Sequence, residues 1–338
     1  MQAAESLPIA DFLKVHTAYD LLPDSGKVVV VDVGLTISSA FLALQENGIT
    51  SAPLWDSNRQ EYVGMLTVTD FIEIILDFYY RYSREEFARH LETYTLREWR
   101  KRRRDRPALQ APPTGRREDL PAPAKHQAAR IPLIFVHPEA SLFDASRVLL
   151  QHRIHRGPVL DPSTNTVLHV ITHARILRYL VSKWRVDSPI LNRTLRELNI
   201  GTYQNIIYVS PSNKVAETLS LLAQRRISAV PVVNGEGVVI GVYSMSDVRH
   251  LLLDDLHSNL ELTVDEALSM RTQQPQASEA GEQHPVYKCT RDDTLKTVFG
   301  RLATYNVHRL VVVDEASRLV GIVSVNDILR FFTAPPSC

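Results

Sequence analysis

The chain has 338 residues, 44% of them hydrophobic and 22% charged, a composition typical of a globular protein with buried cores. Its 38 basic and 38 acidic residues cancel, so no overall field draws it to nucleic acid or to an anionic membrane, and we expect neither partner. The only cysteines, Cys289 and Cys338, exclude a disulfide framework and a four-cysteine zinc site, and they favour a reducing compartment, cytoplasm or nucleus.

The N-terminal segment, residues 1–23, carries acids and prolines where a signal peptide needs a basic start and an apolar core. No apolar run along the chain reaches the roughly 18 residues that a spanning helix requires. We therefore expect neither a leader nor membrane insertion.

Residues 24–81 predict the order strand, helix, strand, strand, helix. The apolar run VVVVD predicts the first strand, and residues 49–54 predict the second. The stretch DSNRQEY has the residue types that join adjacent antiparallel strands, so a hairpin is expected there. The segment GMLTVTDFIEII then predicts a strand that runs directly into a helix.

The same order recurs over residues 131–185, 198–256 and 284–334. Equivalent strand positions fall at residues 53, 158, 231 and 311, with proline at the first three. Equivalent helix-start positions fall at residues 70, 175, 247 and 327, and the spacings of the two series agree within one residue. The sequence thus predicts an α/β fold made of four copies of one unit.

An insertion separates the first two units, over residues 82–130. Residues 82–106 are polar and helical in pattern and end in the basic run 97–106, and residues 107–132 carry six prolines, as a linker would. Such a run can bind phosphates or an acidic surface, but we favour a solvated helix end that leads into a flexible linker. A connector is predicted over residues 257–283, and a second loose stretch, residues 273–285, overlaps its end.

Three units begin their last helix with Ser/Thr-x-x-Asp, at Thr67 to Asp70, Ser244 to Asp247 and Ser324 to Asp327. The pattern is that of a capping box, which satisfies free amides at a helix start. A carboxylate at a strand-to-helix junction can also accept the hydroxyls of a ribose, while the helix N-terminus favours an anion. The second unit has Arg175 at this position, and arginine accepts no hydrogen bond.

The pair His155-Arg156 in the second unit is repeated by His308-Arg309 in the fourth. A basic pair leading into an apolar strand indicates a phosphate clamp, against the alternative of ordinary exposed strand ends. No metal site is predicted, because no third ligand accompanies His152 and His155. The sequence also lacks a phosphate-binding Gly-Lys loop and a nucleophile elbow, so no catalytic residues are expected.

The units resemble cystathionine β-synthase (CBS) motifs, which pair into Bateman domains. The strings YDLLPDSGKVVVVDVGLTISSAFLALQENGI, RIHRGPVLD, IGTYQNI, VHRLVVVDE and GIVSVNDIL extend the resemblance to the γ regulatory subunits of AMP-activated and sucrose-non-fermenting protein kinases. The resemblance implies a flattened disc of two Bateman domains. It also implies a non-catalytic, energy-sensing subunit, without a resident cofactor, in a heterotrimer with a catalytic α and a scaffolding β subunit.

By position, the resemblance assigns adenine-nucleotide contacts, for AMP, ADP or ATP, to residues of all four units. They are Met65, Thr67, Asp70, Ile134, His155, Arg156, Thr202, Ile207, Ser228, Ala229, Ser244, Asp247, Arg271, Tyr287, His308, Arg309, Ser324 and Asp327.

Three departures from the family pattern bear on these sites. The animal pattern has an arginine where this chain has Thr50, a lysine at Ala174 and a serine at Asn326. Because two cations are lost, we expect nucleotides at Asp247 and Asp327 and weak binding at Asp70. The same losses motivate an alternative, a structural γ subunit without nucleotide regulation. A third reading, an independent enzyme, lacks any nucleophile or base constellation.

Overall fold

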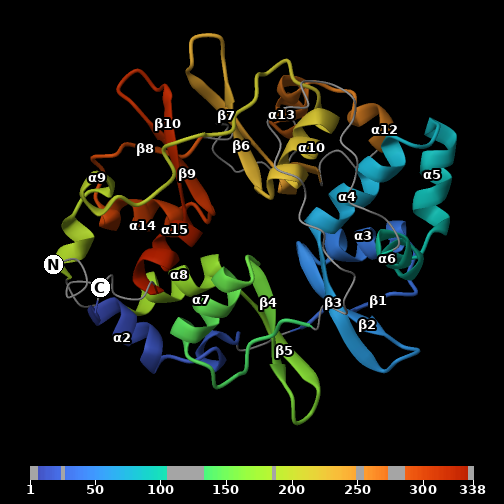
Figure 1. Ribbon diagram of the computed structural model, residues 1–338, viewed down its shortest axis with the longest axis horizontal. Coiled ribbons are helices and arrows are strands. Elements are labelled where there is room, and N and C mark those ends of the chain that lie inside the picture. The colour runs from blue at the N-terminus through green and yellow to red at the C-terminus, as the bar shows by residue number, and fades with distance from the viewer. Residues whose placement is uncertain are drawn as a thin grey trace.

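A computed structural model describes residues 7–23, 27–104, 133–184, 188–248, 255–272 and 286–333 of the protein. Within these ranges the repeat forms four α/β units arranged around a common centre, in a flattened disc (Figure 1). The linker predicted over 107–132 and the loop at 273–285 both lie outside the described residues.

Each unit is built on an antiparallel hairpin. The hairpins pair β2 (Ser51–Asp56) with β3 (Glu61–Thr67), β4 (Arg156–Asp161) with β5 (Thr166–Thr172), β6 (Ala229–Val233) with β7 (Val239–Ser244), and β9 (Arg309–Val313) with β10 (Leu319–Ser324). All four shift register near the end of the first strand, for example between Leu54 and Trp55. The shared irregularity confirms that the units are copies of one structure.

The strand expected before each first helix is short. It forms β1 (Val31–Asp32) and β8 (Lys288–Cys289), which run parallel to β2 and β9. In the other two units it is reduced to single parallel bridges, Val136 to Val159 and Val209 to Val232. Proline has no amide hydrogen to donate, and this pairing needs only its carbonyl as an acceptor. The Pro158 carbonyl, for example, accepts a hydrogen bond from the Val136 amide at 2.9 Å.

Two helices flank each hairpin, as the periodicity predicts. Those before the hairpins are α3 (Ile37–Glu46), α7 (Leu142–Gln151), α10 (Val215–Arg225) and α14 (Leu295–Thr304). Those after them are α4 (Val68–Tyr79), α8 (His173–Lys183), the short η3 (Met245–Asp247) and α15 (Val325–Thr333). The last helix expected in the third unit is described only to Val248.

The units contact one another in two ways. Helices join units one and three, where α4 packs on α10, and units two and four, where α8 packs on α14 and α15 (Figure 1). Each of these two pairs contributes to its own large apolar core, so burial of apolar surface holds the pairs together. Hairpin-side contacts join units three and four, where the Val239 amide donates to the Ser317 carbonyl at 3.0 Å.

A second fourfold repeat, Thr-x-x-Asp/Glu, starts short helical segments against the units. The threonines Thr17, Thr95, Thr194 and Thr263 each form a β-bridge at the N-terminal end of a unit's first helix. The segments that begin there are η1 (Tyr19–Leu21), α6 (Leu96–Arg104), α9 (Leu195–Leu198) and α13 (Val264–Thr272). The remaining helices, α2 (Leu7–Val15), α5 (Arg84–Thr93), η2 (Pro189–Asn192) and α12 (Leu256–Asn259), precede them. Connecting segments thus complete all four units.

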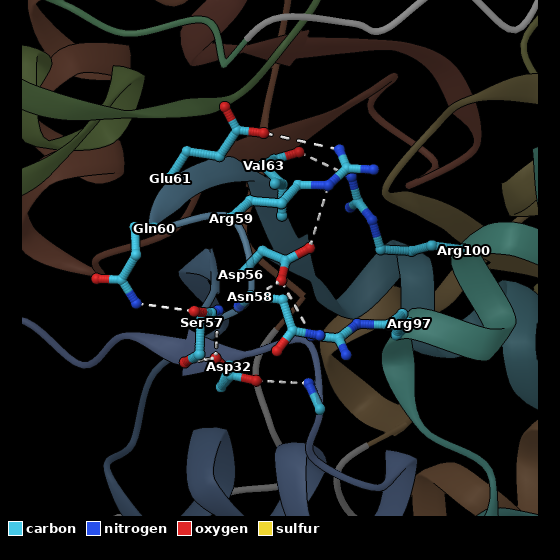
Figure 2. A network of polar contacts seen from close by, with 11 residues as sticks. Asp32, Asp56, Ser57, Asn58, Arg59, Gln60, Glu61, Val63, Arg97 and Arg100 are labelled. Atoms are coloured by element: carbon cyan, nitrogen blue, oxygen red, sulfur yellow. Dashed lines mark hydrogen bonds and ion pairs between the residues drawn. The ribbon is translucent and has the colours of Figure 1, made fainter.

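The arginine-rich helix α6 buries one face against the first unit while Glu98, Lys101 and Arg103 are exposed, so the solvated helix end that we expected describes only its outer face. Trp99 is buried in the core that units one and three share. Arg97 donates to the Asp56 carboxylate at 3.0 Å and Arg100 to the Val63 carbonyl at 2.7 Å (Figure 2). Gly64 has φ +147° and leaves the space in which the Arg100 guanidinium lies. The acceptors that these arginines contact are far away in the sequence, so the fold determines them and the local sequence pattern does not.

None of the described helices is both long and apolar enough to cross a membrane.

Candidate nucleotide-binding site

The three Ser/Thr-x-x-Asp patterns form capping boxes, as predicted. Asp70 Oδ2 accepts from the Thr67 amide at 2.8 Å and from its hydroxyl at 2.7 Å. Asp247 Oδ2 accepts from the Ser244 amide at 2.7 Å, and Asp327 Oδ2 from the Ser324 amide at 2.8 Å. Each cap engages one carboxylate oxygen, so capping and ribose binding are compatible because they use different oxygens.

The second unit uses the same position differently. The Arg175 amide donates to the Thr172 hydroxyl at 3.2 Å, which keeps the N-cap. Its guanidinium Nε donates to the Leu21 carbonyl at 3.1 Å and so holds the N-terminal segment against this unit. Arg175 therefore has a structural contact where the other units offer a carboxylate.

The two arginines of the basic pairs occupy equivalent positions. Arg156, which starts β4, donates to the hydroxyls of Thr50 and Ser51 in the first unit. Arg309, which starts β9, donates to the hydroxyl of Ser228 in the third unit. Thr50 and Ser228 are equivalent residues, each just before its hairpin. The second unit thus extends a guanidinium to the first, and the fourth extends one to the third. These contacts group the units as one with two and three with four.

These guanidiniums lie where their charge is poorly compensated. Within the described part of the chain, their hydrogen-bond acceptors are neutral hydroxyls. Burial lowers the pKa of Arg156, and it lowers the pKa of Arg309 to about 10, although the Asp247 carboxylate opposes that shift. A phosphate would supply the missing negative charge.

The two histidines of the basic pairs come from adjoining units, His155 from the second and His308 from the fourth, and lie at the same place. Partial burial, followed by the charges of Arg309 and Arg156, lowers the pKa of His155. Partial burial also lowers the pKa of His308 to about 4, with further contributions from Arg309, Arg156 and His155. Both imidazoles keep contact with solvent, and protein crowds them from the remaining directions. The structure therefore brings together the four cationic residues that the sequence singled out.

Two further residues at this centre were not predicted as site residues. Asn326 Nδ2 lies 3.1 Å from His155 Nδ1 and so links the fourth unit to the second. His173, the first residue of α8, is 3% exposed and lies near His155 and Asn326. Burial and then the nearby His155 lower its pKa to about 3. Its signal in the sequence is a histidine where the other units have Val68, Met245 and Val325.

Other predicted contact residues lie on the surrounding elements. Met65 pairs with Pro53 in the first hairpin and Ala229 with Ser244 in the third. Thr202 forms a bridge with Ile322 of β10, and Tyr287 stacks on Tyr305 with ring centroids 4.4 Å apart. The others are Ile134, before the bridge at Val136, Ile207, which packs on the core of units one and three, and Arg271 on α13, whose side chain lies outside the described structure. Their nucleotide contacts stay predictions.

The first-unit carboxylate has an ion-pair partner. Arg103 of α6 lies 3.1 Å from Asp70 Oδ1, the oxygen that the cap leaves unused, and 2.8 Å from Glu73 Oε2. Among the described residues there is no group of three or more His, Cys, Asp or Glu side chains placed to hold a metal ion.

Four stretches of the chain, residues 20–77, 127–182, 199–254 and 282–334, match the CBS domain family, and the chain belongs to this family. It is 37% identical over 329 residues to the γ-3 subunit of 5'-AMP-activated protein kinase from Bos taurus, which covers 96% of this chain and 60% of that protein. It is likewise 37% identical over 327 residues to the γ subunit of 5'-AMP-activated protein kinase from Dictyostelium discoideum, covering 95% of this chain and 52% of the relative.

The chain therefore spans less than two thirds of the length of these relatives. A solved Methanocaldococcus jannaschii protein, described as an archaeal homologue of the same γ subunit, has the same fold, with a TM-score of 0.67 and 19% identity over 94% of this chain and 99% of that one. The expected fold of four paired CBS units in a disc is confirmed.

Proposed function

We propose that this chain is the adenine-nucleotide-binding γ regulatory subunit of a heterotrimeric AMP-activated-type protein kinase. The observation that carries the proposal is the cationic centre, where Arg156 and Arg309 donate to hydroxyl acceptors of the described residues and lie with His155 and His308. AMP, ADP or ATP would place phosphates there and a ribose at Asp247 or Asp327, each at a helix start.

The relatives support the rest of the assembly. Their names are those of γ subunits of an AMP-activated protein kinase, and the likeness extends over nearly all of this chain. We infer partners of the same kind, a catalytic α subunit and a bridging β subunit, with this chain regulating and not catalysing. Because two cysteines allow no disulfide framework, we infer a reducing compartment, the cytoplasm or the nucleus.

A ligand regulates such a complex only if it binds one assembled state better than another. Exchange of ATP against AMP or ADP changes the charge at the centre, and the cationic residues come from units two and four. This gives the nucleotide a means to alter how these units contact the kinase.

Calorimetric titration of the full chain with AMP tests the binding half of the proposal. We expect binding to two sites, and we expect Arg309→Gln to weaken it roughly tenfold or more, because one charge-assisted contact is lost. Arg59→Gln, a charge change at the tip of the first hairpin, is the matched control and should bind as the unaltered chain does. Absence of AMP, ADP and ATP binding to the unaltered chain would refute the proposal.

The second candidate, a structural γ subunit without nucleotide regulation, is motivated by Thr50 and Ala174. Reconstitution with α and β subunits separates the two. If AMP binds normally but neither kinase activity nor protection of the activation loop responds, the structural role is correct.

A further inference from the structure

The first unit differs from the others in the residues beside its helix-start position. Three residues after Asp70 stands Glu73, whereas the corresponding residues of the other units are Arg178, His250 and Arg330. Burial raises the pKa of Glu73, Asp70 raises it further, and Arg103 opposes both. The first unit therefore pairs two acids at these positions, where units three and four pair an acid with a base and the second unit pairs two arginines.

Arg103 satisfies this acidic pair from within the chain. Its guanidinium bridges the two carboxylates, with Nη1 3.1 Å from Asp70 Oδ1 and Nη2 2.8 Å from Glu73 Oε2. The guanidinium also lies 5.2 Å from the ring centroid of Trp99, a cation–π contact on its own helix. Asp70 is thereby fully engaged, with one oxygen in the helix cap and the other on Arg103.

The helix that presents Arg103 is fixed in place. The Arg97 amide donates to the Val33 carbonyl at 2.8 Å, and the buried side chains of Leu96 and Trp99 together with the ion pair of Arg97 with Asp56 hold α6 to the first unit. Arg103 itself is 52% exposed, compared with 19% for the Asp70 side chain. The position of α6 therefore determines this contact, while the Arg103 guanidinium remains accessible to a competing ligand.

We propose that Arg103 occupies the ribose position of the first unit and keeps that site closed to nucleotides while α6 is docked. The proposal rests on the proposed function, and it gives the weak site expected at Asp70 a cause beyond the missing cation at Thr50. A nucleotide binds there only after it displaces Arg103 from Asp70 Oδ1.

The repeat offers a contrasting role for this arginine. Arg103 follows Thr95 by eight residues, as Arg271 follows Thr263, and the two threonines occupy equivalent bridges. The family resemblance makes Arg271 a phosphate contact. If Arg103 served a phosphate in the same way, its removal would weaken nucleotide binding. The two roles therefore predict effects of opposite sign.

AMP titration of the full chain and its Arg103→Ala variant separates them. We expect two binding equivalents for the unaltered chain and a third for the variant, at least roughly tenfold tighter than any third equivalent of the unaltered chain. Lys101→Ala, an exposed position on the same helix with the same loss of charge, is the control and should bind as the unaltered chain does. The added equivalent should disappear in the double variant Arg103→Ala, Asp70→Ala.

Several results would overturn the proposal. They are an unchanged stoichiometry in Arg103→Ala, weaker binding in that variant, or a third equivalent that survives removal of Asp70. Glu73→Gln removes one ion-pair partner of Arg103 and leaves the sequence of α6 unchanged, so it is a second test of the proposal. It should tighten binding of the third equivalent by a smaller factor than Arg103→Ala does. If the unaltered chain binds no AMP, the proposed function fails, and occlusion is still decided by whether Arg103→Ala gains one equivalent.

Discussion

At the scale of single residues, the centre of the disc combines cations whose charged forms the free protein disfavours. His308 has a pKa of about 4, chiefly through partial burial, and the pKa of His155 is lowered in the same way. Both rings are therefore largely neutral at pH 7. A bound phosphate stabilises the charged imidazole, so each pKa is higher in the complex than in the free chain.

Nucleotide binding should accordingly take up protons. As pH falls from 8 to 6.5, still above the second phosphate pKa of about 6, AMP should bind more tightly, by up to about tenfold per pH unit for each histidine that becomes charged. Titration in two buffers of different ionisation enthalpy measures the uptake. The double variant His155→Gln, His308→Gln should show none. Proton release, or uptake that this variant retains, would contradict the argument.

The identities of the central residues were predictable, but their partners were not. His155, Arg156, His308 and Arg309 stand out because basic pairs interrupt otherwise apolar repeats. That Arg156 reaches Thr50 depends on how units pack across more than a hundred residues of sequence. His173 was missed because a single histidine at a helix start does not by itself indicate a site. Only its burial beside His155 places it at the centre of the disc.

At the scale of elements, local sequence patterns predicted which strands and helices form but not which units they pack against. Alternation and turn residues predicted the hairpins, and the register shift common to all four confirms the repeat. The Thr-x-x-Asp/Glu series at Thr17, Thr95, Thr194 and Thr263 is equally visible in the sequence, but it lies outside the unit cores and was not predicted. The basic residues of helix α6 outnumber its apolar ones and predict solvent exposure, which Lys101 and Arg103 have, but Leu96 and Trp99 bury the other face of the helix.

Trp99→Ala should therefore loosen α6. The side chain is 5% exposed, and truncation of a buried aromatic ring costs about 3–5 kcal/mol. We expect the urea midpoint to fall and hydrogen exchange to accelerate in α5 and α6 with little change in α8. Trp55→Ala, on the first hairpin and in edge contact with Tyr62, serves as a comparison and should leave exchange in α6 unchanged. Unaltered exchange in α6 of Trp99→Ala would show that the ion pairs alone hold the helix.

At the scale of the whole molecule, the two kinds of interface alternate around the disc. Units one and three, and units two and four, share apolar cores through their helices, whereas the arginines of units two and four reach hydroxyls across the other two junctions. The first kind is held by large apolar cores, whereas units three and four share only a small apolar cluster among the described residues. The second gathers like charges, so it is the kind that an anionic ligand can strengthen.

Nucleotide phosphates should therefore stabilise the disc as a unit. A ligand present at a hundred times its Kd and bound only to the folded state adds about 2.7 kcal/mol per site, so AMP should raise the melting temperature measurably. Adenosine, which keeps the ribose and base but lacks the phosphate, should raise it far less at the same concentration. The double variant Arg156→Gln, Arg309→Gln should melt no earlier without ligand, because the change relieves repulsion, and should lose most of the AMP effect. Equal stabilisation by adenosine and AMP would mean that the ribose and base, and not the cationic centre, provide the binding energy.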